Sequence, residues 1–488
     1  NAFTINYQLI TMNSPPMIDI KNLTIKKAHQ HLKNGDFSVR ELVDAYLSEI
    51  KKKDGEIHAY IEIFSDLDES VIRAQKMFED GTATELTGIP CSIKDNMLFK
   101  GHITSSGSKI LENYVATYNG TAIAKIIDAG AVILGRTNMD EFAMGSSTEH
   151  SYYGPTKNPL DTSRVPGGSS GGAAASVAMD GALFALASDT GGSICQPASL
   201  CGIVGFKPTY GGVSRYGLGA LASSLDQIGP LTKNIEDAEI VHSFISGFDP
   251  MDSTTVTDEV RALGATRTLK KKIGVPWHLF QDGLRPDMKE NLDTAIDRLK
   301  KAGYEIVDVE LPHAKYALAV YYILLPAEAS SNLARYDGVR YGLREEGKDL
   351  MDTYMKSRGK GFGKEVRRRI MLGTYVLSHG YYDAYYNKAR KLQKVITDEF
   401  EKVFESVDAV LTPTTPSPAF KFGEKTNDPV AMYLSDVFSV PANIAGIPAL
   451  TMPFGKSTEG LPLDIHLMGP ACGEHILFSI GKDFENVE

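Results

Sequence analysis

The sequence predicts an α/β fold in which helices cover both faces of a mixed central β-sheet and a helical insertion interrupts the sheet. The first observation is an alternation of short apolar runs with helical patterns up to about residue 247. Such alternation is typical of sheets whose faces are covered by helices. The second is a change to longer helical patterns over residues 248–405, after which strand patterns return. At 488 residues with 42% hydrophobic side chains, the chain can bury a large core.

The helix predicted over residues 38–53 has a clear start signal. Ser38 and Glu41 have the spacing of a capping box, and the apolar residues that follow recur at helical intervals. The other elements expected in this half are strands at 88–97, 131–137 and 182–188 and helices at 121–130 and 171–181. The chain thus passes repeatedly from strand to helix, as a helix-covered sheet requires.

The second half is expected to add a strand–helix–strand unit, long helices and returning strands. The unit comprises residues 271–277, 291–303 and 304–312, the most prominent helical segment is 373–407, and the returning strands are 409–419, 447–455 and 461–469. No clear linker or internal repeat appears. We therefore expect a tail at 1–17 and a single domain over 18–488, with the helix-rich insertion at about 248–405 inside it.

Composition and charge argue against several classes of function. No run of about 18 uncharged apolar residues occurs, so we expect no membrane span, and the first residues do not read as a secretory signal. A net charge of −10 disfavours direct nucleic-acid binding, because phosphate contacts need Lys/Arg clusters. Four cysteines without a C-x-x-C pair do not form a disulfide framework, which favours a reducing, cytoplasmic compartment.

Four stretches carry the candidate chemistry. They are residues 89–96 with Lys94, 165–172 with Ser169 and Ser170, 188–199 with Ser193, and the polar stretch 223–230, whose role the sequence alone does not reveal. A serine hydroxyl is a weak nucleophile and needs a base. None of the eleven histidines has a suitable context. A lysine at the end of an apolar strand can be the base if burial keeps it neutral; the alternative is that Lys94 merely pairs with a carboxylate such as Asp95.

Glycines flank both serine stretches. They permit tight turns and close approach of a substrate to the backbone. Amides around Thr190–Ser193 can converge on a developing oxyanion, an arrangement that favours acyl transfer. The alternatives for 165–172 are a flexible loop or a phosphate cradle at a helix start. Neither stretch has the lysine of a P-loop, and the residues around Ser193 lack the G-x-S-x-G spacing of a nucleophile elbow.

Residues 166–217, from "PGGSSGG" through "SDTGGSICQPAS" to "SRYG", together with "GIPCSIKDN" at 88–96, resemble the amidase signature family. The resemblance implies the amidase signature fold and a Ser–Ser–Lys mechanism. Ser193 would be the nucleophile, and Ser169, held in a cis peptide bond, would pass its proton to the base Lys94. The oxyanion hole and its support would be formed by the amides of Thr190, Gly191, Gly192 and Ser193 and by Ser170.

The resemblance extends over nearly the whole chain. In particular, the sequence resembles the amidotransferase members of the family, which release ammonia from glutamine. The stretches that carry it include 136–159, 223–234 and 435–450. The resemblance implies that Arg369, with Arg368 as the alternative, grips the α-carboxylate, because guanidinium suits a bidentate grip. Asp436 would hold the α-ammonium, and Tyr322 or Tyr321 would line the pocket. Without the resemblance, three adjacent arginines on a helix indicate a solvated face.

The same resemblance implies the partners. Glutamine or another small amide is the expected substrate, and a tRNA-binding partner subunit is expected to use the ammonia with ATP and magnesium. A small third subunit would clasp the two. This chain itself is expected to need no metal or other cofactor, to bind neither nucleic acid nor membrane directly, and to be cytoplasmic.

Cys195 departs from the family pattern, which has arginine two residues after the nucleophile. In the family that arginine resembles a charge partner of the aspartate that is Asp189 here, and removing one member of a buried ion pair is costly. The sequence leaves four explanations open: another group compensates for the arginine, Asp189 is protonated or hydrated, the site is remodelled, or the substitution was made deliberately. Cys195 as a rival nucleophile lacks a nearby histidine or other thiolate-stabilising group, so we expect a small buried thiol in former arginine space.

Three functional interpretations follow. The first is the glutaminase subunit of a tRNA-dependent amidotransferase. The second is a stand-alone amidase that hydrolyses another small amide with the same triad. The third is a catalytically impaired assembly subunit, against which the retention of Lys94, Ser169 and Ser193 counts.

Overall fold

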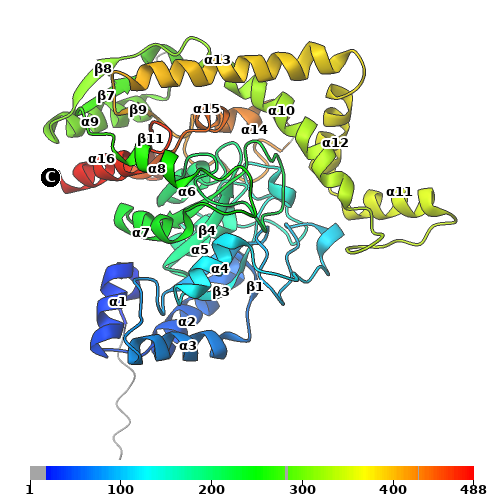
Figure 1. Ribbon diagram of the computed structural model, residues 1–488, viewed down its shortest axis with the longest axis horizontal. Helices are drawn as coiled ribbons and strands as arrows, with labels where there is room; N and C mark the ends of the chain where they lie inside the picture. Colours follow the sequence, from blue (N-terminus) through cyan, green and yellow to red (C-terminus); the bar gives the residue numbers. More distant parts are fainter. Residues whose placement is uncertain (1–17, 281–283, 427, 488) are drawn as a thin grey trace, which may run out of the picture.

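The computed structural model describes residues 18–280, 284–426 and 428–487, and one mixed β-sheet runs through its centre (Figure 1). Eleven strands of these residues pair in the order β1-β3-β2-β4-β6-β5-β10-β11-β9-β7-β8. The strands are β1 (Tyr60–Ile63), β2 (Pro90–Lys94), β3 (Val132–Thr137), β4 (Phe184–Asp189), β5 (Val204–Lys207), β6 (Gln227–Thr232), β7 (Lys272–Val275), β8 (Glu305–Asp308), β9 (Ala409–Thr412), β10 (Ala449–Lys456) and β11 (Pro462–Met468). The predicted tail at 1–17 lies outside the described residues.

Parallel and antiparallel pairing both occur, so the prediction of a mixed sheet is confirmed. Strand β2 runs parallel to β3 and β4, and β7 runs parallel to β8 and β9. The centre, from β4 through β6, β5, β10 and β11 to β9, is antiparallel. Strands β2, β4, β5 and β6 are buried along their whole length, which explains their continuous apolar runs.

The described helices of the first half include those predicted at 38–53, 121–130 and 171–181, together with others that were not predicted. They are α1 (Ile25–Asn34), α2 (Val39–Ile57), α3 (Leu67–Glu79), α4 (Thr121–Asp128), α5 (Gly171–Ala178), α6 (Cys195–Cys201) and α7 (Ile235–Ile245). The capping box of α2 is present, with Ser38 and Glu41 bonded reciprocally. The small residues of α5 let it pack closely on β4 and β2, and this packing positions the glycine-rich loop before α5.

The insertion contributes strands as well as helices, because β7 and β8 extend the same sheet. The remaining helices are α8 (Asp258–Ala265), α9 (Pro286–Lys301), α10 (Ala317–Asn332), α11 (Leu350–Gly361), α12 (Lys364–Val376), α13 (Asn387–Phe404), α14 (Pro429–Tyr433), α15 (Val440–Ala445) and α16 (Glu474–Asn486). The helical segment predicted at 373–407 is broken between α12 and α13. Gly380 there has a φ of +81°, which no right-handed helix contains.

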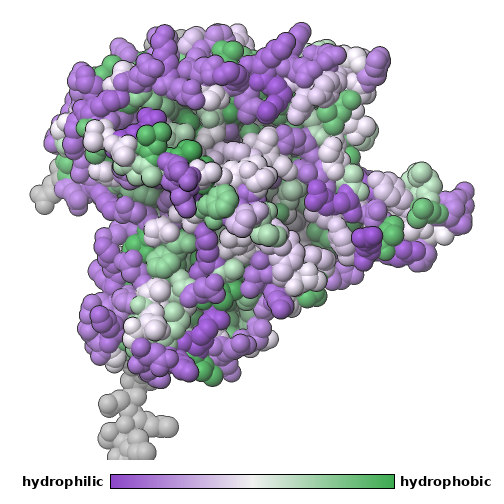
Figure 2. Space-filling model, viewed as in Figure 1, coloured by the Kyte–Doolittle hydropathy of each residue, from purple (hydrophilic) through white to green (hydrophobic). Residues whose placement is uncertain are grey.

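Helix α11 forms an arm that projects from the body (Figure 1). Its apolar side chains Leu350, Met351 and Met355 are exposed, and Figure 2 shows hydrophobic atoms on this arm. By contrast, α10 packs against α12, α13 and α15 and closes one side of the sheet. In the part of the chain that the structure describes, no helix is long and apolar enough to cross a membrane.

Candidate active site

Lys94 ends β2, between β3 and β4, and its side chain is fully buried. Its Nζ lies 2.8 Å from Ser169 Oγ and 2.7 Å from Ser170 Oγ, and 3.3 Å from the carbonyl oxygen of Ser188. Burial lowers the pKa of Lys94 to about 7, although nearby carboxylates oppose this shift. A lysine with that pKa is substantially neutral at physiological pH and is able to accept a proton.

Ser169 lies in a loop that hydrogen bonds hold from both sides. The Gly168–Ser169 peptide bond is cis, as the family resemblance implied. The Gly168 amide donates to Gln196 Oε1 (2.8 Å), and Ser170 Oγ donates to the Ser188 carbonyl (3.0 Å). Gln196 belongs to α6, the helix that follows Ser193. The bridging serine and the nucleophile loop are therefore fastened to each other.

Ser193 lies in the turn between β4 and α6 and is 7% exposed, whereas Ser169 and Ser170 are fully buried. Among the described residues no hydrogen bond joins Ser193 to Ser169, and such catalytic contacts often tighten only when substrate binds. The sequence expectation was that four amides line an oxyanion hole. The Gly192 amide instead donates to Asp189 Oδ1 (2.8 Å), while in the described part of the chain the amides of Thr190, Gly191 and Ser193 donate to no other group.

Asp189 holds this turn together from the end of β4. Its carboxylate accepts the Gly192 amide, the Ile194 amide at 2.7 Å and the Asn443 side-chain amide at 2.7 Å. Gly192 has a φ of +117°, a conformation that suits glycine and turns its amide inward. The hydrogen-bond donors around the Asp189 carboxylate are thus neutral, whereas the family pattern supplies an arginine as its partner.

Cys195 begins α6 and is 1% exposed. Burial, reinforced by the nearby carboxylate of Asp189, raises the pKa of its thiol well above the usual range. A buried thiol of this kind is poorly nucleophilic, because the thiolate is the reactive form. The expectation of a small core residue is therefore met, and the geometry does not favour Cys195 as the rival nucleophile.

The stretch 223–230, which the sequence left without a role, supports Thr190. Its first part is a loop and its last part belongs to β6. Asp226 in this loop accepts a hydrogen bond from Thr190 Oγ1 (2.8 Å) and others from the amides of Leu221 and Ala222. Thr190 is therefore held by an element far from it in sequence.

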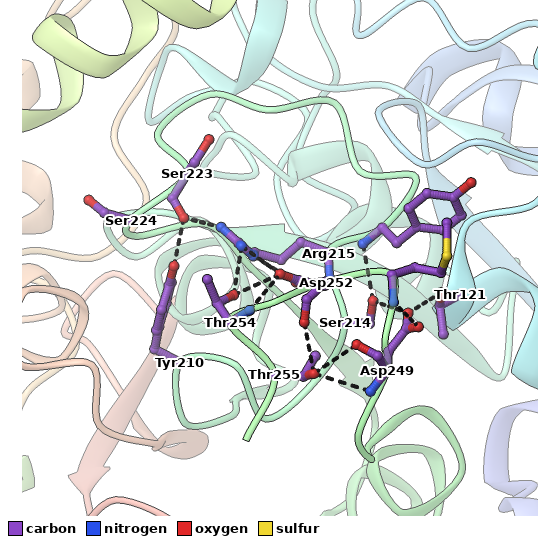
Figure 3. A network of polar contacts seen from close by, with 12 residues as sticks. Thr121, Tyr210, Ser214, Arg215, Ser223, Ser224, Asp249, Asp252, Thr254 and Thr255 are labelled. Carbon is purple, nitrogen blue, oxygen red and sulfur yellow. Dashed lines mark hydrogen bonds and ion pairs between the residues drawn. The ribbon is translucent and has the colours of Figure 1, made fainter. Parts of the chain in front are cut away.

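A polar network fastens that loop to the start of the insertion (Figure 3). Arg215 forms an ion pair with Asp252, with its Nη2 2.8 Å from Oδ1 and its Nε 3.0 Å from Oδ2. Arg215 also donates to the Ser223 carbonyl, which accepts the Tyr210 hydroxyl at 2.8 Å as well. The network thus braces the loop that carries Asp226.

Arg369 of α12 is 3% exposed and lies against two stacked tyrosine rings. Its guanidinium carbon is 5.5 Å from the ring centroids of both Tyr322 and Tyr433, and its Nε donates to Glu365 (2.9 Å). The Nη groups make no hydrogen bond among the described residues, so they remain available for a carboxylate. The neighbouring Arg368 is half exposed in its side chain and pairs with Glu365 from the outside.

Asp436, at the end of a short 3₁₀ turn (Leu434–Asp436), faces the nucleophile loop. A Cβ atom added to Gly192 would lie 3.8 Å from Asp436 Oδ1. Oδ2 accepts the Ser146 hydroxyl, whereas Oδ1 is buried without a partner among the described residues. Burial raises the pKa of Asp436 to about 7. An unpartnered carboxylate oxygen beside the loop fits a cationic group of a ligand.

Tyr321 and Tyr322 have different positions. A Cβ atom added to Gly191 would lie 2.6 Å from the Tyr321 hydroxyl, so Tyr321 packs directly on the nucleophile loop. Tyr322 packs edge-on against Tyr321 and carries Arg369 on its ring. Tyr322, the expected pocket residue, thus orients the arginine, and Tyr321 covers the loop.

A cavity of about 320 Å³ opens beside these residues. Its lining includes Gly145, His150, Arg369 and Tyr433. Gly145 precedes Ser146, whose hydroxyl donates to Asp436, but neither Ser193 nor Asp436 is among the described residues that line this cavity. Within residues 18–280, 284–426 and 428–487, no group of three or more His, Cys, Asp or Glu side chains is arranged to hold a metal ion.

The fold and these motifs identify the chain as a member of the Amidase family, whose sequence profile matches residues 41–478. The predicted family and fold class are thereby confirmed. Among its relatives, the A subunit of glutamyl-tRNA(Gln) amidotransferase from Caldanaerobacter subterraneus subsp. tengcongensis is 51% identical over 475 residues, covering 96% of this chain and 97% of the relative. That of Desulfatibacillum aliphaticivorans is 50% identical, with coverage of 96% and 97%.

Solved structures give the same result. The A subunit of glutamyl-tRNA(Gln) amidotransferase from Thermotoga maritima superposes with a TM-score of 0.79 at 42% identity, covering 96% of each chain. The peptide amidase of Stenotrophomonas maltophilia has a TM-score of 0.79 at 28% identity, covering 96% of this chain and 97% of its own. The fold is therefore shared by an amidotransferase subunit and by an enzyme named a peptide amidase.

Three residues that position the site were not found from the sequence. Asn443 binds Asp189, Gln196 binds the Gly168 amide, and Asp226 binds Thr190. Each is an ordinary polar residue whose partner is distant in sequence or separated by a turn. Only their place in long motif-like stretches gave a signal: Asn443 lies in "SVPANIAGIP", Asp226 in "SSLDQIGP" and Gln196 in "SDTGGSICQPAS".

Proposed function

We propose that this chain is the glutamine amidohydrolase subunit of a tRNA-dependent amidotransferase. The observation that carries the proposal is the buried contact of Lys94 with Ser169 and Ser170, close to a loop that presents Ser193. The relatives named as the A subunit of glutamyl-tRNA(Gln) amidotransferase, which match 96% of the chain at about 50% identity, support the particular substrate.

In the proposed reaction, Ser193 Oγ attacks the side-chain carbonyl carbon of glutamine. Its proton passes to Ser169 Oγ, whose own proton passes to neutral Lys94. The oxyanion is stabilised by the amides of Thr190, Gly191 and Ser193. The C–N bond then breaks, and the leaving nitrogen takes up the proton from Lys94 and departs as ammonia. Water adds to the glutamyl ester by the same proton route, which releases glutamate and restores Ser193.

The α-amino acid end of glutamine is assigned to a wall formed by Arg369 of the insertion and Asp436 beyond it. Two Nη groups of Arg369 suit the α-carboxylate, because a planar guanidinium donates two parallel hydrogen bonds. The unpartnered Oδ1 of Asp436 suits the α-ammonium. An ammonium ligand also favours the ionised form of Asp436, whose pKa burial has raised to about 7.

The partners and location belong to the same proposal. A second subunit would activate misacylated tRNA with ATP and magnesium and use the ammonia, and a small third subunit would join the two. This chain would need no cofactor, and direct tRNA binding is assigned to the partner because the net charge here is −10. A cytoplasmic location agrees with four free cysteines.

The test is release of ammonia from glutamine by the full chain, alone and with its partner subunits, and by Ser193→Ala. We expect release by the wild type, stimulated by partners, and loss with Ser193→Ala; Cys195→Ala is the matched control and stays within about twofold. Hydrolysis of simple amides by the chain alone, with no preference for glutamine, would instead support the stand-alone amidase. Absence of release in every combination would reject the proposal and favour the assembly subunit.

A further inference from the structure

Asp189 is a fully buried carboxylate whose hydrogen-bonding partners are all neutral. They are the amides of Gly192 and Ile194, a longer contact from the Cys195 amide (3.4 Å) and the side chain of Asn443. A buried negative charge needs a compensating positive charge or it destabilises the fold. The polar neighbours stabilise the carboxylate, but none of them is a cation.

Lys207 is a fully buried cation whose hydrogen-bonding partners are neutral. Its Nζ donates to the carbonyl oxygens of Pro208 (3.2 Å) and Ile447, and among the described residues no carboxylate contacts it. It ends β5, two strands away from β4, with β6 between them. Lysines are almost never fully buried unless they are paired, so the position of Lys207 calls for a negative charge nearby.

The register of the sheet places Lys207 and Asp189 on the same face. Asp189 pairs with Gln227 on β6, and Gly205 pairs with Leu231 on that strand. Because successive side chains alternate between faces, Gln227, Asp189 and Lys207 all project from one face. Thr451, opposite Gly205, and His466, opposite Thr451, continue this face. Cys195 lies over it, and its thiol is within reach of Thr451 and of the field of Lys207.

Several buried polar atoms on or next to this face make no hydrogen bond among the described residues. Both side-chain polar atoms of Gln227, Nε2 of His466 and Oδ1 of Asn443 lack hydrogen-bond partners among the described residues. Burial lowers the pKa of His466 to about 3, so this ring is neutral and supplies no charge. Lys94 on β2 lies on the same face and also feels Asp189, but burial lowers its pKa to about 7 and its proposed role as the base requires the neutral form. Lys207 is therefore the cation that this face offers to Asp189.

We propose that Lys207 balances the charge of Asp189 across this face and is thereby a positioning residue for the nucleophile loop, in place of the arginine that the family pattern has at position 195. The inference rests on the proposed function, because its purpose is to keep the loop of Ser193 in its reactive shape. With the charge of Lys207 in place, the Asp189 carboxylate holds the amides of Gly192 and Ile194. Without it, this buried carboxylate has no compensating charge on the face, and the loop loosens.

The protonation state of Lys207 agrees with this role. Burial lowers the pKa of Lys207 to about 8, while Asp189 on β4, the Cys195 thiol on α6 and Glu474 on α16 oppose the shift. Lys207 therefore carries its charge at pH 7 and loses it above about pH 8. Neutral His466 on β11 is the further titratable group that feels Lys207. The proposal thus adds an alkaline limb to the pH profile, beside the acid limb expected from Lys94.

The test compares Lys207→Met, Cys195→Arg with Lys207→Met, and Thr451→Val in the full chain with its partner subunits. Lys207→Met is expected to lower kcat for glutamine about 10-fold or more while KM stays within about twofold, because the substrate wall is untouched. Adding Cys195→Arg is expected to restore most of the kcat and to remove the alkaline limb, because a guanidinium stays protonated. Thr451→Val, which alters the same face without changing its charge, is expected to stay within about twofold.

Two further measurements, the folding and activity of the double variant and the labelling of Ser193, decide the remaining outcomes. Should Lys207→Met alone fail to fold, the double variant is still expected to fold and react, and its failure would overturn the proposal. Labelling of Ser193 by a fluorophosphonate, read by mass, reports the loop without glutamine: the Ser193 O–P bond forms and fluoride leaves. Labelling of Ser193 in the wild type without release of ammonia from glutamine would reject the proposed function but not the role of Lys207. The role of Lys207 would be rejected if Lys207→Met were labelled and turned over glutamine at wild-type rates. It would also be rejected if adding Cys195→Arg did not restore kcat.

Discussion

The floor of the site and its outer wall are built differently. The floor, with Lys94, Ser169, Ser170 and Asp189, is fully buried and comes from the ends of β2 and β4 and from the loop before α5. The wall, with Arg369 and Asp436, comes from α12 and a 3₁₀ turn, and α12 exposes Met371 on its other side. A floor embedded in a sheet is rigid and suits proton transfer, whereas a wall of helices is suited to fitting a substrate. Changes in the floor should therefore alter kcat, and changes in the wall KM.

The largest effect is expected from Lys94→Met. Loss of the base is expected to lower kcat about 10³-fold, because general-base catalysis contributes on the order of 10²–10⁴-fold. Steady-state release of ammonia from glutamine measures it, and KM should change little. Ser92→Ala is the matched control, since Ser92 lies on the same strand and bonds Ser176 away from the site. A kcat for Lys94→Met within tenfold of the wild type would show that the floor does not supply the base.

The pH profile tests the same floor without altering it. Below about pH 7 Lys94 is protonated and is unable to accept a proton, so fluorophosphonate labelling of Ser193 should rise about tenfold per pH unit up to pH 7. Above about pH 8, where Lys207 loses its charge, the labelling rate should fall again. The labelling rate avoids the titration of Asp436, which affects glutamine binding. Asp436→Asn should therefore keep the wild-type labelling profile. A profile that is flat from pH 5 to 7 would contradict the low pKa of Lys94.

Substitutions in the wall should give the opposite pattern. Asp436→Asn and Arg369→Lys are each expected to raise KM for glutamine about 10- to 100-fold, since a charge-assisted hydrogen bond to the substrate is lost or weakened. Labelling of Ser193 should remain within about threefold, because the probe lacks both charged groups of glutamine. Glutamine titrations and labelling rates measure the two effects. A large loss of labelling would mean that the wall also shapes the floor.

The smallest effect is expected in the network of Figure 3. Arg215→Met breaks the paired contact with Asp252 and frees the loop of Asp226, whose side chain binds Thr190 of the site. We expect kcat to fall about threefold and the free energy of unfolding to fall by about 1–3 kcal/mol, as for a charged hydrogen-bonded partner. Urea unfolding and ammonia release measure the two quantities. Unchanged stability together with wild-type kcat would show that the network does not brace the loop.

The sequence predicted the floor better than the wall for a physical reason. Strand patterns, a glycine-rich loop and a lysine after an apolar run are local signals, and β2, β4 and the two serine loops lie where they indicated. Arg369 alone was ambiguous, because three adjacent arginines indicate a solvated face. Only the tertiary fold places Arg369 against Tyr322 of α10 and Tyr433 of α14 and leaves Arg368 half exposed.

Other features depend on contacts that no local pattern encodes. The Gly192 amide was expected in the oxyanion hole, but it turns inward because Asp189 accepts it. The role of Asn443 requires α15 to pack under β4, and the buried face with Lys207 follows from strand order rather than from spacing. The strand–helix–strand unit predicted inside the insertion is confirmed by β7, α9 and β8, but only strand order shows that β7 and β8 extend the central sheet next to β9.

The central claim is that Ser193 forms the covalent intermediate. Its most direct test is to quench the full chain during turnover of glutamine, digest it, and locate the glutamyl ester by fragmentation mass spectrometry. The account predicts one glutamyl adduct on Ser193 in the wild type, none in Ser193→Ala, and an unchanged adduct in Cys195→Ala. An adduct on Cys195, or turnover of glutamine by Ser193→Ala, would contradict it.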